Sequence, residues 1–510
     1  MARTKVTRVV AAVMAPSMAE TLRAVEASTG GADLIELRVD AIRDPDLEAL
    51  RLADSRPLIF TCRSPREGGV FRGSETERRE ILRRALELGF DYVDIELDTI
   101  DHALRDIETS SRLILSHHAF DSLPDDLPGW VDRAADWGAD VLKLAGRASS
   151  LADVLRLGEI GPAAHDRGLA YAPITMGPAG VAGRVLASRL GAEWTYAAAR
   201  GLTATGPGQL DLDELLERYR FRSIDASTQI YGIVGLPVQG SLSPVMHNDS
   251  FGRRGLNAVY VPFEEEELST FVEAAKDLGV AGLSVTRPFK EAILPFLDDL
   301  DHDAKAIGAV NTVSVRKGKW LGFNTDAEGA VRPIARRMRL AGKRAVILGA
   351  GGAARAAAVG LRRAGAKVVV LARNPARAKA VADVADGDAG GLTELARRPW
   401  DILINATPLA SGLLERGREP ESLRPGAAVL DMVYEPQQTE LLEAARQRGA
   451  MAIPGLEMLV AQAVRQAEIW TGSPASEEYM ELAAREELSR RAKGLERVST
   501  EERISRKSAP

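Results

Sequence analysis

Short apolar runs alternate with amphipathic, charged stretches along residues 1–222 of the chain. The stretch 75–88 is typical of the second kind, because its apolar positions recur at helical spacing and its outer positions are charged. Apolar runs bounded by turn-forming residues indicate buried strands. The predicted strands are Val9–Met14, Leu34–Val39, Pro57–Cys62, Tyr92–Leu97, Leu113–Ser116, Val141–Ala145, Ala170–Thr175 and Trp194–Ala197.

Eight strand–helix units in about 220 residues are what a (β/α)8 TIM barrel requires. The alternative is an open, doubly wound sheet, which the same alternation permits. We predict the barrel because the number and the spacing of the units match it. The overall prediction is an α/β protein in which a second, two-lobed α/β part follows this N-terminal barrel.

The alternation is interrupted twice. Residues 211–222 are predicted as a closing helix, and after the polar stretch 223–229 new units start at Ile230–Gly235. Another break, 336–343, precedes a strong strand, and the Glu- and Arg-rich end of the chain predicts a frayed helix or a disordered tail. The predicted domains are 1–222 (barrel), 230–335 with 456–483 (substrate binding), 336–455 (dinucleotide binding) and 484–510 (charged tail).

The composition restricts the partners of the chain. Its 66 Lys and Arg against 72 Asp and Glu give a net charge of −6, which does not suit a general nucleic-acid binder. The single cysteine, Cys62, excludes an internal disulfide framework and a cysteine-based zinc site. No apolar run approaches the roughly 20 residues that span a bilayer, and the first strand starts too early for a signal or transit peptide. We therefore expect a cytoplasmic protein with small-molecule substrates and with neither nucleic acid nor membrane as partner. The oligomeric state stays open, and a monomer is compatible with the sequence.

Lys143 stands out because lysine is rare in the first part of the chain. Between Met1 and Ser227 the only lysines are Lys5 and Lys143, although arginine is abundant. Lys143 lies inside an apolar strand. A desolvated lysine, unlike arginine, can lose its proton and attack a carbonyl carbon, so Lys143 is a Schiff-base candidate. The alternative is a strand-end lysine whose amine reaches solvent.

Polar motifs follow the carboxyl ends of other predicted strands, where barrel active sites form. Each motif alone is compatible with a solvated strand end or a simple turn. The motifs are Glu36-Leu-Arg38-Val-Asp40, Thr61-Cys-Arg63 up to Glu67-Gly-Gly, Ser116-His117-His118-Ala119-Phe120, Gly183-Arg184 and Thr205-Gly-Pro-Gly-Gln209. Their combination, in this order and spacing, resembles the type I 3-dehydroquinate dehydratases over residues 6–222.

The resemblance implies a role for each motif. It implies that Lys143 forms an imine with the C3 ketone of 3-dehydroquinate and that His118, oriented by Glu67, removes the C2 proton and later protonates the leaving C1 hydroxyl. The implied substrate-binding residues are Glu36, Arg38, Arg63, Arg184, Thr205 and Gln209. The chemistry agrees, because a protonated imine acidifies the neighbouring C–H and a histidine can act first as base and then as acid.

The chain departs from that family at three positions. Ala119 stands where Asp often follows the base, Thr205 replaces a serine, and Ala12 occupies a place in the first strand where serine is frequent. We prefer His118 as the base because it precedes the small residue and Phe of the family pattern. His117 is the competing candidate.

A glycine-rich turn joins the strand Arg344–Leu348 to an alanine-rich helix. In the run from Gly349 to Ala354, the first glycine permits a tight turn and the second lets the backbone approach a pyrophosphate. The next strand, 367–371, is followed by Arg373 and Arg377 rather than by an acidic residue. Because arginine suits a 2′-phosphate, we predict NADP as the cofactor. The alternative is a solvated helix start.

Further motifs surround this turn, and in isolation they are helix caps and turns. They are Ser241-Leu-Ser243-Pro, Thr286-Arg-Pro-Phe-Lys290, Asn311-Thr, Asn324-Thr-Asp326, Met432-Val-Tyr434, and Gly455-Leu-Glu-Met up to Gln462. Together and in this order they resemble the shikimate dehydrogenases, with a Rossmann NADP domain, over residues 230–483.

This second resemblance implies that Lys290 and Asp326 are the catalytic pair and that Lys290 exchanges the proton of the C3 oxygen. The implied substrate contacts are Ser241, Ser243, Thr286, Asn311, Asp326, Tyr434 and Gln462, and the implied NADP contacts are Gly349, Ala350, Gly351, Gly352, Ala353, Arg373, Arg377, Met432 and Gly455. No metal is required, and the six histidines form no evident metal-binding pattern. Ser284, Arg287 and Ala372 depart from the family pattern.

The two resemblances imply consecutive steps of chorismate and aromatic amino acid biosynthesis. The barrel would dehydrate 3-dehydroquinate, and the second part would reduce 3-dehydroshikimate to shikimate with NADPH. Three alternatives stay open: a catabolic quinate/shikimate dehydrogenase, an aldolase-type barrel that shares only the lysine, and a non-catalytic metabolite-sensing regulator. Arg373 and Arg377 speak against the first, Glu67 with His118 against the second, and the presence of all the catalytic groups against the third.

Overall fold

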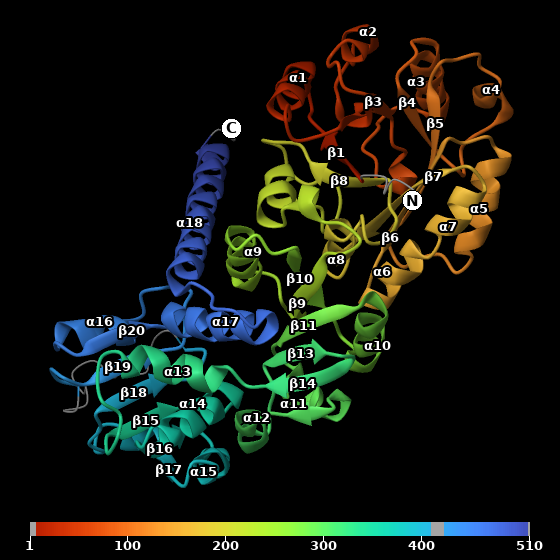
Figure 1. The fold of residues 1–510 in the computed structure, drawn as a ribbon. Helices are drawn as coiled ribbons and strands as arrows, with labels where there is room; N and C mark the ends of the chain where they lie inside the picture. The colour runs from red at the N-terminus through yellow and green to blue at the C-terminus, as the bar shows by residue number, and fades with distance from the viewer. Residues whose placement is uncertain (1–6, 410–422, 508–510) are drawn as a thin grey trace. The chain divides into compact units, whose positions relative to one another are not determined.

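The structure of the chain is a computed structural model that describes residues 7–409 and 423–507 (Figure 1). It contains two compact units, of which the first comprises Met1–Gln239 and Leu256–Val280 and the second comprises Gly240–Gly255 and Ala281–Pro510. These units do not follow the predicted domains, because residues 229–239 and 256–280 group with the barrel. The predicted boundaries therefore stay predictions.

The first unit is built on an eight-stranded parallel sheet in which sequence neighbours pair, in the order β7-β6-β5-β4-β3-β2-β1-β8. The strands are β1 Arg8–Val13, β2 Leu34–Arg38, β3 Leu58–Thr61, β4 Tyr92–Glu96, β5 Arg112–Ala119, β6 Val141–Arg147, β7 Ala170–Met176 and β8 Trp194–Ala198. The sheet curls into a nearly closed barrel, and a hydrogen bond from Glu193 N to Tyr171 O (2.9 Å) links the start of β8 to β7. The predicted barrel and its eight strands are confirmed.

Helices cover the outside of the barrel, and side-chain caps start most of them. Ser74 and Glu77 form a reciprocal capping box at the first turn of α3, and Ser17 caps α1. The helices are α1 Met18–Ala27, α2 Leu47–Arg51, α3 Glu75–Glu87, α4 His102–Arg105, α5 Leu127–Asp136, α6 Leu151–Gly158, α7 Gly161–Asp166 and α8 Val181–Val185.

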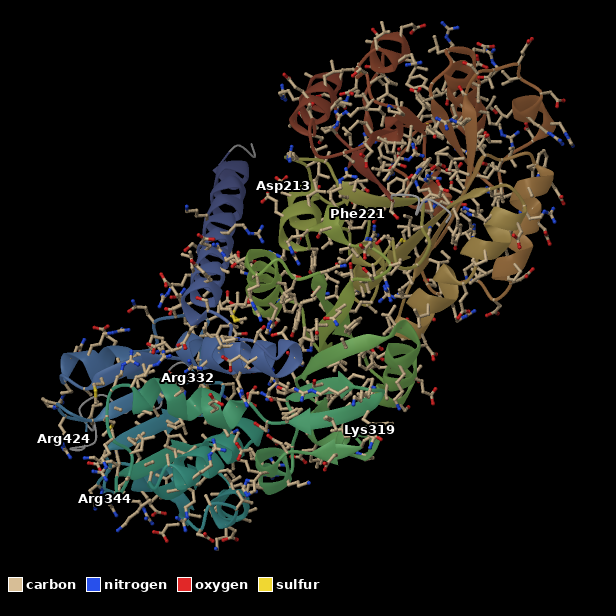
Figure 2. All side chains as sticks on the ribbon, viewed as in Figure 1. Asp213, Phe221, Lys319, Arg332, Arg344 and Arg424 are labelled. Atoms are coloured by element: carbon tan, nitrogen blue, oxygen red, sulfur yellow. The ribbon has the colours of Figure 1, made fainter. Side chains whose placement is uncertain are left out.

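The predicted closing helix at 211–222 is only partly right. The chain forms a π-helical turn at Glu214–Arg218 and a 3-10 turn at Phe221–Ser223. Arg220 separates them with a φ of 50°, in the left-handed region, which a continuous right-handed helix does not contain. Asp213 precedes the first of these turns and Phe221 begins the second, and both are labelled in Figure 2.

Side chains inside the barrel change from apolar to charged along several of the strands, β6 among them. Val10, Ile59, Ile114 and Trp194 belong to an apolar cluster. Two residues beyond Val141, on the same face of β6, stands Lys143, which is 4% exposed. The strand period of two therefore places a charged layer next to an apolar one.

The first unit also holds the parallel pair β9 Gln229–Gly235 and β10 Ala258–Glu264 and the helix α10 Leu268–Leu278. The carboxylate of Glu265, directly after β10, accepts a hydrogen bond from Leu151 N at 2.7 Å, at the start of α6. Glu265 is 2% exposed. A buried carboxylate therefore ties this pair to the barrel helices.

The second unit contains two lobes. In one, β13 Thr312–Arg316 pairs antiparallel with β11 Val280–Val285 and with β14 Lys319–Phe323, and β12 Asp299–Leu300 pairs with β14 in parallel. Lys319, labelled in Figure 2, starts β14. The helices of this lobe and its surroundings are α9 Ser243–Arg253, α11 Phe289–Ala292, α12 His302–Ile307, α13 Asp326–Ala335, α17 Gly455–Thr471 and α18 Glu477–Lys507.

The other lobe is a parallel sheet in the order β17-β16-β15-β18-β19-β20, which is the strand order of dinucleotide-binding folds. Arg344, labelled in Figure 2, begins β15. The elements are β15 Arg344–Leu348, α14 Gly352–Arg363, β16 Lys367–Ala372, α15 Pro375–Asp383, β17 Asp388–Gly391, β18 Ile402–Asn405, β19 Ala428–Asp431, α16 Glu440–Gln447 and β20 Met451–Pro454. The predicted Rossmann topology is confirmed.

Residues 477–507 form a continuous helix, α18, so of the two alternatives predicted for this stretch the described residues adopt the helix. Met480, Ala484 and Leu488 recur at a spacing of four and are buried against α9 and α17. The high content of Glu and Arg hid this narrow apolar stripe, because three small or flexible apolar side chains are enough to seat one helix face.

Candidate active sites

One cavity at the carboxyl ends of the barrel strands gathers every predicted site residue of the first unit. It is lined by Glu36, Arg38, Arg63, Glu67, His118, Lys143, Arg184, Thr205 and Gln209, together with Tyr196 and the apolar side chains of Phe120, Ala145, Ile174 and Met176. These residues come from positions up to about 170 apart in the chain. Barrel closure brings them together, because parallel strands present all their carboxyl ends at one rim.

Lys143 is held in the charged layer below this cavity. Its Nζ donates hydrogen bonds to Glu36 Oε1 at 2.7 Å and to Asp94 Oδ2 at 3.0 Å, and lies 4.4 Å from the ring centroid of Tyr196. The amine does not reach bulk solvent, so the alternative of a strand-end lysine snorkelling outward is wrong. Two carboxylates and an aromatic face stabilise positive charge at Nζ.

Asp94 and Glu96 were missed by the sequence analysis, although they lie on a predicted strand. Both are 1% exposed, and Arg63 donates to Asp94 Oδ2 at 2.8 Å, to Glu96 Oε1 at 3.3 Å and to Ser116 Oγ at 2.7 Å. Burial opposes the charge of Asp94, but Arg63 and Lys143 more than offset it and hold the pKa of Asp94 well below its usual range. Two charges alternating inside an apolar strand were the signal that could have found them.

His118 and Glu67 form the predicted dyad. Glu67 Oε2 accepts hydrogen bonds from the backbone N of His118 at 3.0 Å and lies 2.9 Å from His118 Nδ1. Burial and the positive charges of Arg63 and Lys143 lower the pKa of His118 to about 4, while Glu67 opposes the shift. Burial would raise the pKa of Glu67, but the nearby ring of His117 and the hydrogen bond with His118 lower it to about 2. The dyad at neutral pH is therefore a carboxylate beside a neutral imidazole whose Nε2 is available as a base.

His117, the competing candidate, lies outside the cavity lining. Its ring stacks on Trp130 with centroids 3.9 Å apart, and its Nδ1 is 3.6 Å from Glu67 Oε1 and 3.8 Å from Asp98 Oδ2. Glu67, Asp98 and His117 thus place three potential metal ligands within 4.8 Å of one another. The sequence analysis missed this group because strand pairing, not chain proximity, assembles it. Because Glu67 already forms hydrogen bonds with His118, we interpret Glu67 as the carboxylate that orients the base rather than as a metal ligand.

Arg184 is the guanidinium in this cavity with free hydrogen-bonding capacity. It is 4% exposed, its Nη2 is 3.5 Å from Pro207 O, and its Nε has no hydrogen-bond partner among the described residues. Burial lowers the pKa of Arg184 to about 10, so it remains positively charged at neutral pH. A buried cation without a counter-ion is suited to an anionic ligand.

The remaining predicted residues line the cavity from two loops. Gln209 Oε1 accepts hydrogen bonds from Thr205 N at 2.6 Å and Thr205 Oγ1 at 3.0 Å, so the hydroxyl of Thr205 is held in place. Arg38 donates to both carboxylate oxygens of Asp40, at 2.9 and 2.8 Å. Asp40 in turn accepts from Val70 N at 3.0 Å. Asp40 thereby fixes Arg38 at the rim.

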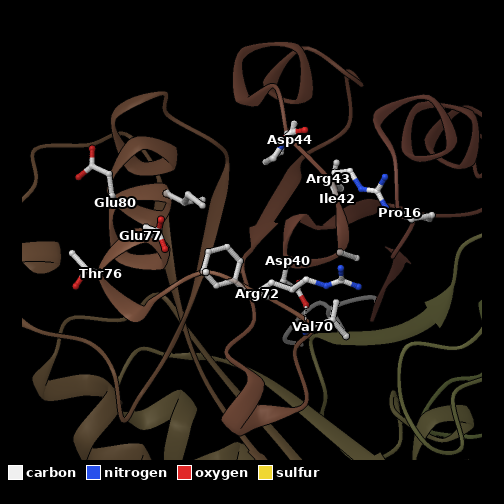
Figure 3. Close-up of a pocket in the computed structure, with 15 residues that line it drawn as sticks. Pro16, Asp40, Ile42, Arg43, Asp44, Val70, Arg72, Thr76, Glu77 and Glu80 are labelled. Atoms are coloured by element: carbon white, nitrogen blue, oxygen red, sulfur yellow. Dashed lines mark hydrogen bonds between the residues drawn. The ribbon is translucent and has the colours of Figure 1, made fainter.

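A second hollow, of about 860 Å³, lies behind this rim between the loops that follow β2 and β3. Figure 3 shows Asp40, Val70 and Arg72 on its wall. It shares Asp40 with the support of Arg38, but none of the predicted catalytic or substrate-binding residues lines it. It therefore belongs to the scaffold around the site.

In the second unit, Lys290 and Asp326 face each other as predicted. Lys290 Nζ donates to Asp326 Oδ2 at 2.5 Å, and Asn311 Nδ2 donates to Asp326 Oδ1 at 2.8 Å and to Gln462 Oε1 at 3.3 Å. Asp326 and Gln462 lie on α13 and α17, and Gly329 lets these helices meet, since a Cβ there would lie 2.9 Å from Gln462 Cβ. The side chain of Lys290 is 23% exposed, so it is open to a substrate oxygen.

The other predicted substrate residues surround this pair on separate segments. Ser243 is buried at the start of α9, and its N donates to Ser241 Oγ at 3.2 Å. Thr286 follows β11, and half-buried Tyr434 follows β19. Ser284, a departure from the family pattern, donates to Gln466 Oε1 at 2.9 Å and so is part of the support below Asn311.

The glycine-rich turn has the geometry that a dinucleotide requires. Gly349 has a φ of 112° and a Cβ there would lie 3.0 Å from Ala406 O, so only glycine fits, whereas Gly351 and Gly352 face open space. The helix α14 starts at Gly352 without a side-chain cap, which leaves its N–H groups for a phosphate. Arg373 is exposed directly after β16. The site thus fits NADP, because the glycine-rich turn and the N–H groups of α14 can bind the pyrophosphate and Arg373 can bind the 2′-phosphate.

The remaining predicted NADP residues close the other side. Met432 follows β19, and Gly455 starts α17 with its Cα packed on the backbone of Asp431 and Met432. Arg377 is exposed on the first turn of α15. The structure therefore brings the predicted cofactor residues to the carboxyl edge of one sheet.

Fold and sites together define a class of protein: an enzyme that joins a barrel with a buried lysine amine to a dinucleotide-dependent reductase. Family models match in the same order: type I 3-dehydroquinase (residues 9–226), shikimate dehydrogenase substrate binding domain (233–313), shikimate/quinate 5-dehydrogenase (333–432) and shikimate 5′-dehydrogenase C-terminal domain (455–485).

Individual relatives agree with the models. The bifunctional 3-dehydroquinate dehydratase/shikimate dehydrogenase of Arabidopsis thaliana, which is chloroplastic, is 37% identical over 91% of this chain and 83% of its own length. The NADP(+) shikimate dehydrogenase of Thermococcus kodakarensis is 45% identical over 52% of this chain and 99% of its own. A solved structure, of the dehydroquinate dehydratase and shikimate dehydrogenase from S. pombe AroM, is 28% identical in sequence. The match covers 94% of this chain and 98% of the solved chain, with a TM-score of 0.45. The chain belongs to the family of bifunctional 3-dehydroquinate dehydratase/shikimate dehydrogenases.

No helix in the described parts of the chain is both long and apolar enough to cross a membrane.

Proposed function

We propose that the first unit dehydrates 3-dehydroquinate through an imine at Lys143. The observation that carries this proposal is the buried amine of Lys143 in the same cavity as the His118–Glu67 dyad. Attack of Nζ on the C3 carbonyl, followed by loss of water, forms the imine. Glu36 and Asp94, which accept hydrogen bonds from Nζ, stabilise the positive charge of its protonated form.

His118 then moves the protons of the elimination. Its neutral Nε2 takes the C2 proton, and the electron pair released at C2 is delocalised into the iminium. The same proton passes to the C1 hydroxyl, which leaves as water, and hydrolysis of the imine releases 3-dehydroshikimate and restores the amine. Glu67 keeps the imidazole in the tautomer with Nδ1–H and stabilises the imidazolium that forms in between.

Substrate binding in the barrel is assigned by charge. Arg184, with its unpaired Nε, is suited to the carboxylate, and Thr205 and Gln209 to hydroxyls. Arg63 lines the cavity, and its two Nη atoms also donate to Asp94, Glu96 and Ser116. We assign Arg63 mainly to fixing Asp94 beside Lys143, with Arg38 and Glu36 facing the ring.

The second unit reduces 3-dehydroshikimate to shikimate. NADPH, held by 349–353, Arg373, Arg377, Met432 and Gly455, supplies a hydride when bound. Lys290 delivers a proton to the substrate oxygen, and Asp326 holds the amine in line with that oxygen. Asn311 and Gln462 orient the substrate hydroxyls, while Ser241, Ser243, Thr286 and Tyr434 surround the carboxylate end.

The two reactions follow one another, because the ketone released by the first is the substrate of the second. Covalent linkage of the two active parts raises the effective concentration of the intermediate near the second site. A lag in shikimate formation equal to that of the separately expressed parts would argue against transfer between the sites.

The cysteine content and the origin of the site residues bear on the location, the partners and the oligomeric state of the protein. We propose a cytoplasmic location because the single cysteine, Cys62, is a free, buried thiol and cannot form a disulfide within the chain. Its partners are small-molecule substrates, and a monomer suffices for both sites, since all the assigned residues come from one chain.

The deciding experiment supplies 3-dehydroquinate with NADPH and follows NADPH absorbance. Wild type is expected to consume NADPH, Lys143→Ala only after addition of 3-dehydroshikimate, and Lys290→Ala under neither condition. Quinate with NAD tests the catabolic alternative. Preference for quinate and NAD, or absence of any turnover, would contradict the proposal.

A further inference from the structure

The helix α18 lies mostly beyond the stretches that the family models match, which end at residue 485. Its apolar stripe packs into one cluster with Leu242, the residue between Ser241 and Ser243. Tyr434 packs against the same cluster. The helix thus touches both segments that carry the proposed carboxylate-binding hydroxyls.

Arg491 makes this connection polar as well as apolar. Its Nη1 donates to Gly240 O at 2.7 Å, and the same nitrogen is 3.7 Å from Glu435 Oε2. Gly240 immediately precedes Ser241, and Glu435 immediately follows Tyr434. One guanidinium therefore bridges the two segments.

The helix holds Arg491 in position for this contact. Glu487 is 6% exposed and accepts a hydrogen bond from Arg491 Nε at 2.8 Å. At the start of α18, Glu477 pairs with Arg332 of α13 at 3.2 Å (Arg332 is labelled in Figure 2) and with Arg336. The guanidinium is thus presented by an anchored helix, and its side chain is 23% exposed.

The backbone conformation of Gly240 explains why the hydrogen bond from Arg491 matters for the position of Ser241. Gly240 has a φ of 82°, in the left-handed region, and its carbonyl is the acceptor for Arg491. Fixing this carbonyl fixes the peptide plane that enters Ser241. Arg491 also acts at longer range: burial and the negative charge of Glu435 raise the pKa of Tyr434, and the positive charges of Arg491 and Arg287 oppose that rise. Arg491 therefore offsets part of the negative charge that Glu435 places beside Tyr434.

We propose that Arg491 is a positioning residue of the dehydrogenase, which fixes the Ser241–Ser243 and Tyr434 segments for binding of the substrate carboxylate. This inference rests on the proposed function of the second unit. It adds a residue of the C-terminal helix to a site that the motifs place elsewhere in the chain.

The test compares Arg491→Ala with Arg490→Ala. Arg490 is a matched control, because it lies on the same helix and bonds the same Glu487 at 3.0 and 3.1 Å but is 59% exposed. In Arg491→Ala we expect the KM for 3-dehydroshikimate to rise about tenfold, because one charge-assisted hydrogen bond that positions the site is lost. The Kd for shikimate, measured by calorimetry without cofactor, should rise by the same factor. We expect kcat to change less than about threefold, and KM for NADPH and the dehydratase rate to stay unchanged. Arg491→Lys, which keeps a charged donor, should recover part of the loss.

The outcomes separate this inference from the proposed function. An unchanged KM and Kd in Arg491→Ala, or an equal rise in KM for NADPH, would overturn the positioning role, and so would an equal effect in Arg490→Ala. If Arg491→Ala does not fold, the conservative variant Arg491→Gln replaces it. Its KM and Kd values relative to wild type then decide whether Arg491 is a positioning residue. If the wild-type protein binds shikimate but does not reduce 3-dehydroshikimate, the proposed function alone is refuted. The ratio of the Kd for shikimate in Arg491→Ala to that in wild type would then still decide the role of Arg491. Wild type that does not bind shikimate would refute both.

Discussion

The amine of Lys143 lies 3.0 Å from Oδ2 of Asp94, and Arg63 donates a hydrogen bond to the same oxygen at 2.8 Å. One buried carboxylate oxygen thus pairs with two cations. A second carboxylate, that of Glu36, completes the surroundings of the amine at 2.7 Å. This arrangement accommodates a cation at Nζ before and after a carbonyl compound is bound.

Borohydride reduction in the presence of 3-dehydroquinate tests the nucleophile. Wild type and Lys290→Ala should gain the mass of a reduced substrate adduct, because the imine is trapped as a stable amine, and Lys143→Ala should not. Intact-protein mass spectrometry followed by peptide mapping locates the adduct. An adduct on any other residue in wild type would remove Lys143 from this role. The NADPH-dependent activity of Lys143→Ala is the folding control.

Substitution of the two adjacent histidines tests which of them is the base. His118→Gln is expected to lower the dehydratase kcat by about a thousandfold, since proton transfer in both directions is lost. His117→Gln is expected to change it by less than about tenfold, because the ring stacks on Trp130 and only touches Glu67. Steady-state rates with both variants decide the matter. The reverse order of effects would assign the base to His117.

The dehydratase should retain its activity to unusually low pH. The base must be neutral, and because the pKa of His118 is lowered to about 4, the neutral form persists until the pH falls to about that value. We expect kcat/KM to be flat down to about pH 5 and to fall about tenfold per pH unit below 4. Enzyme returned to pH 7 after each measurement controls for unfolding.

The variant Glu67→Gln tests the cause of that pH profile. The charge of Glu67 raises the pKa of His118 against the effect of burial. Its removal should therefore move the acidic limb to still lower pH while kcat drops because the ring is less well oriented. A limb that moved towards neutral pH would contradict the assigned electrostatics.

Cofactor preference should depend on Arg373 and Arg377. With both changed to Ala, we expect KM for NADPH to rise about ten- to hundredfold and KM for NADH to change little, because only NADPH carries the 2′-phosphate. Initial rates with each dinucleotide measure the preference. Equal losses for both dinucleotides would indicate a general defect of the lobe. The exposed Arg397 offers a control substitution on the same lobe.

Glu265 makes stability depend on pH in the first unit. Burial, with a smaller contribution from Asp153, raises the pKa of Glu265 to about 8, against the hydrogen bond from Leu151 N, while the unfolded value is near 4.5. The folded form therefore keeps a proton that the unfolded form releases, so the free energy of unfolding decreases as the pH rises from about 4.5 to about 8.

Glu265→Gln removes this dependence, because an amide keeps the acceptor oxygen and carries no charge. At pH 8 we expect the variant to be more stable than wild type, by an amount on the order of 3 kcal/mol, and at pH 4.5 to be nearly equal to it. Calorimetric unfolding at both pH values measures the difference. A stabilisation that is the same at both pH values would show that the charge is not its source.

Much of this molecule could be predicted from local pattern. The eight barrel strands and the glycine-rich turn each carry their own signal, since strand period, turn residues and helix starts are encoded over a few neighbouring positions. The chemistry of Lys143 was also visible, because a single lysine among many arginines in an apolar strand needs no partner to be noticed.

Contacts between distant segments could not be predicted in this way. Asp94, Glu96 and Tyr196 entered the first site only when the barrel closed, and the ion pairs of Arg63 with two buried acids of the next strand were not visible in the sequence. The order of α18 likewise depends on the surface offered by α9 and α17.

The sequence by itself determined which elements form, in what order, and which reactive groups they carry, because these follow from side-chain periodicity and residue type. The tertiary structure alone decided which charges share a low-dielectric interior and which backbone carbonyl meets Arg491. Electrostatic energy depends on distance and burial, and neither is a property of position along the chain.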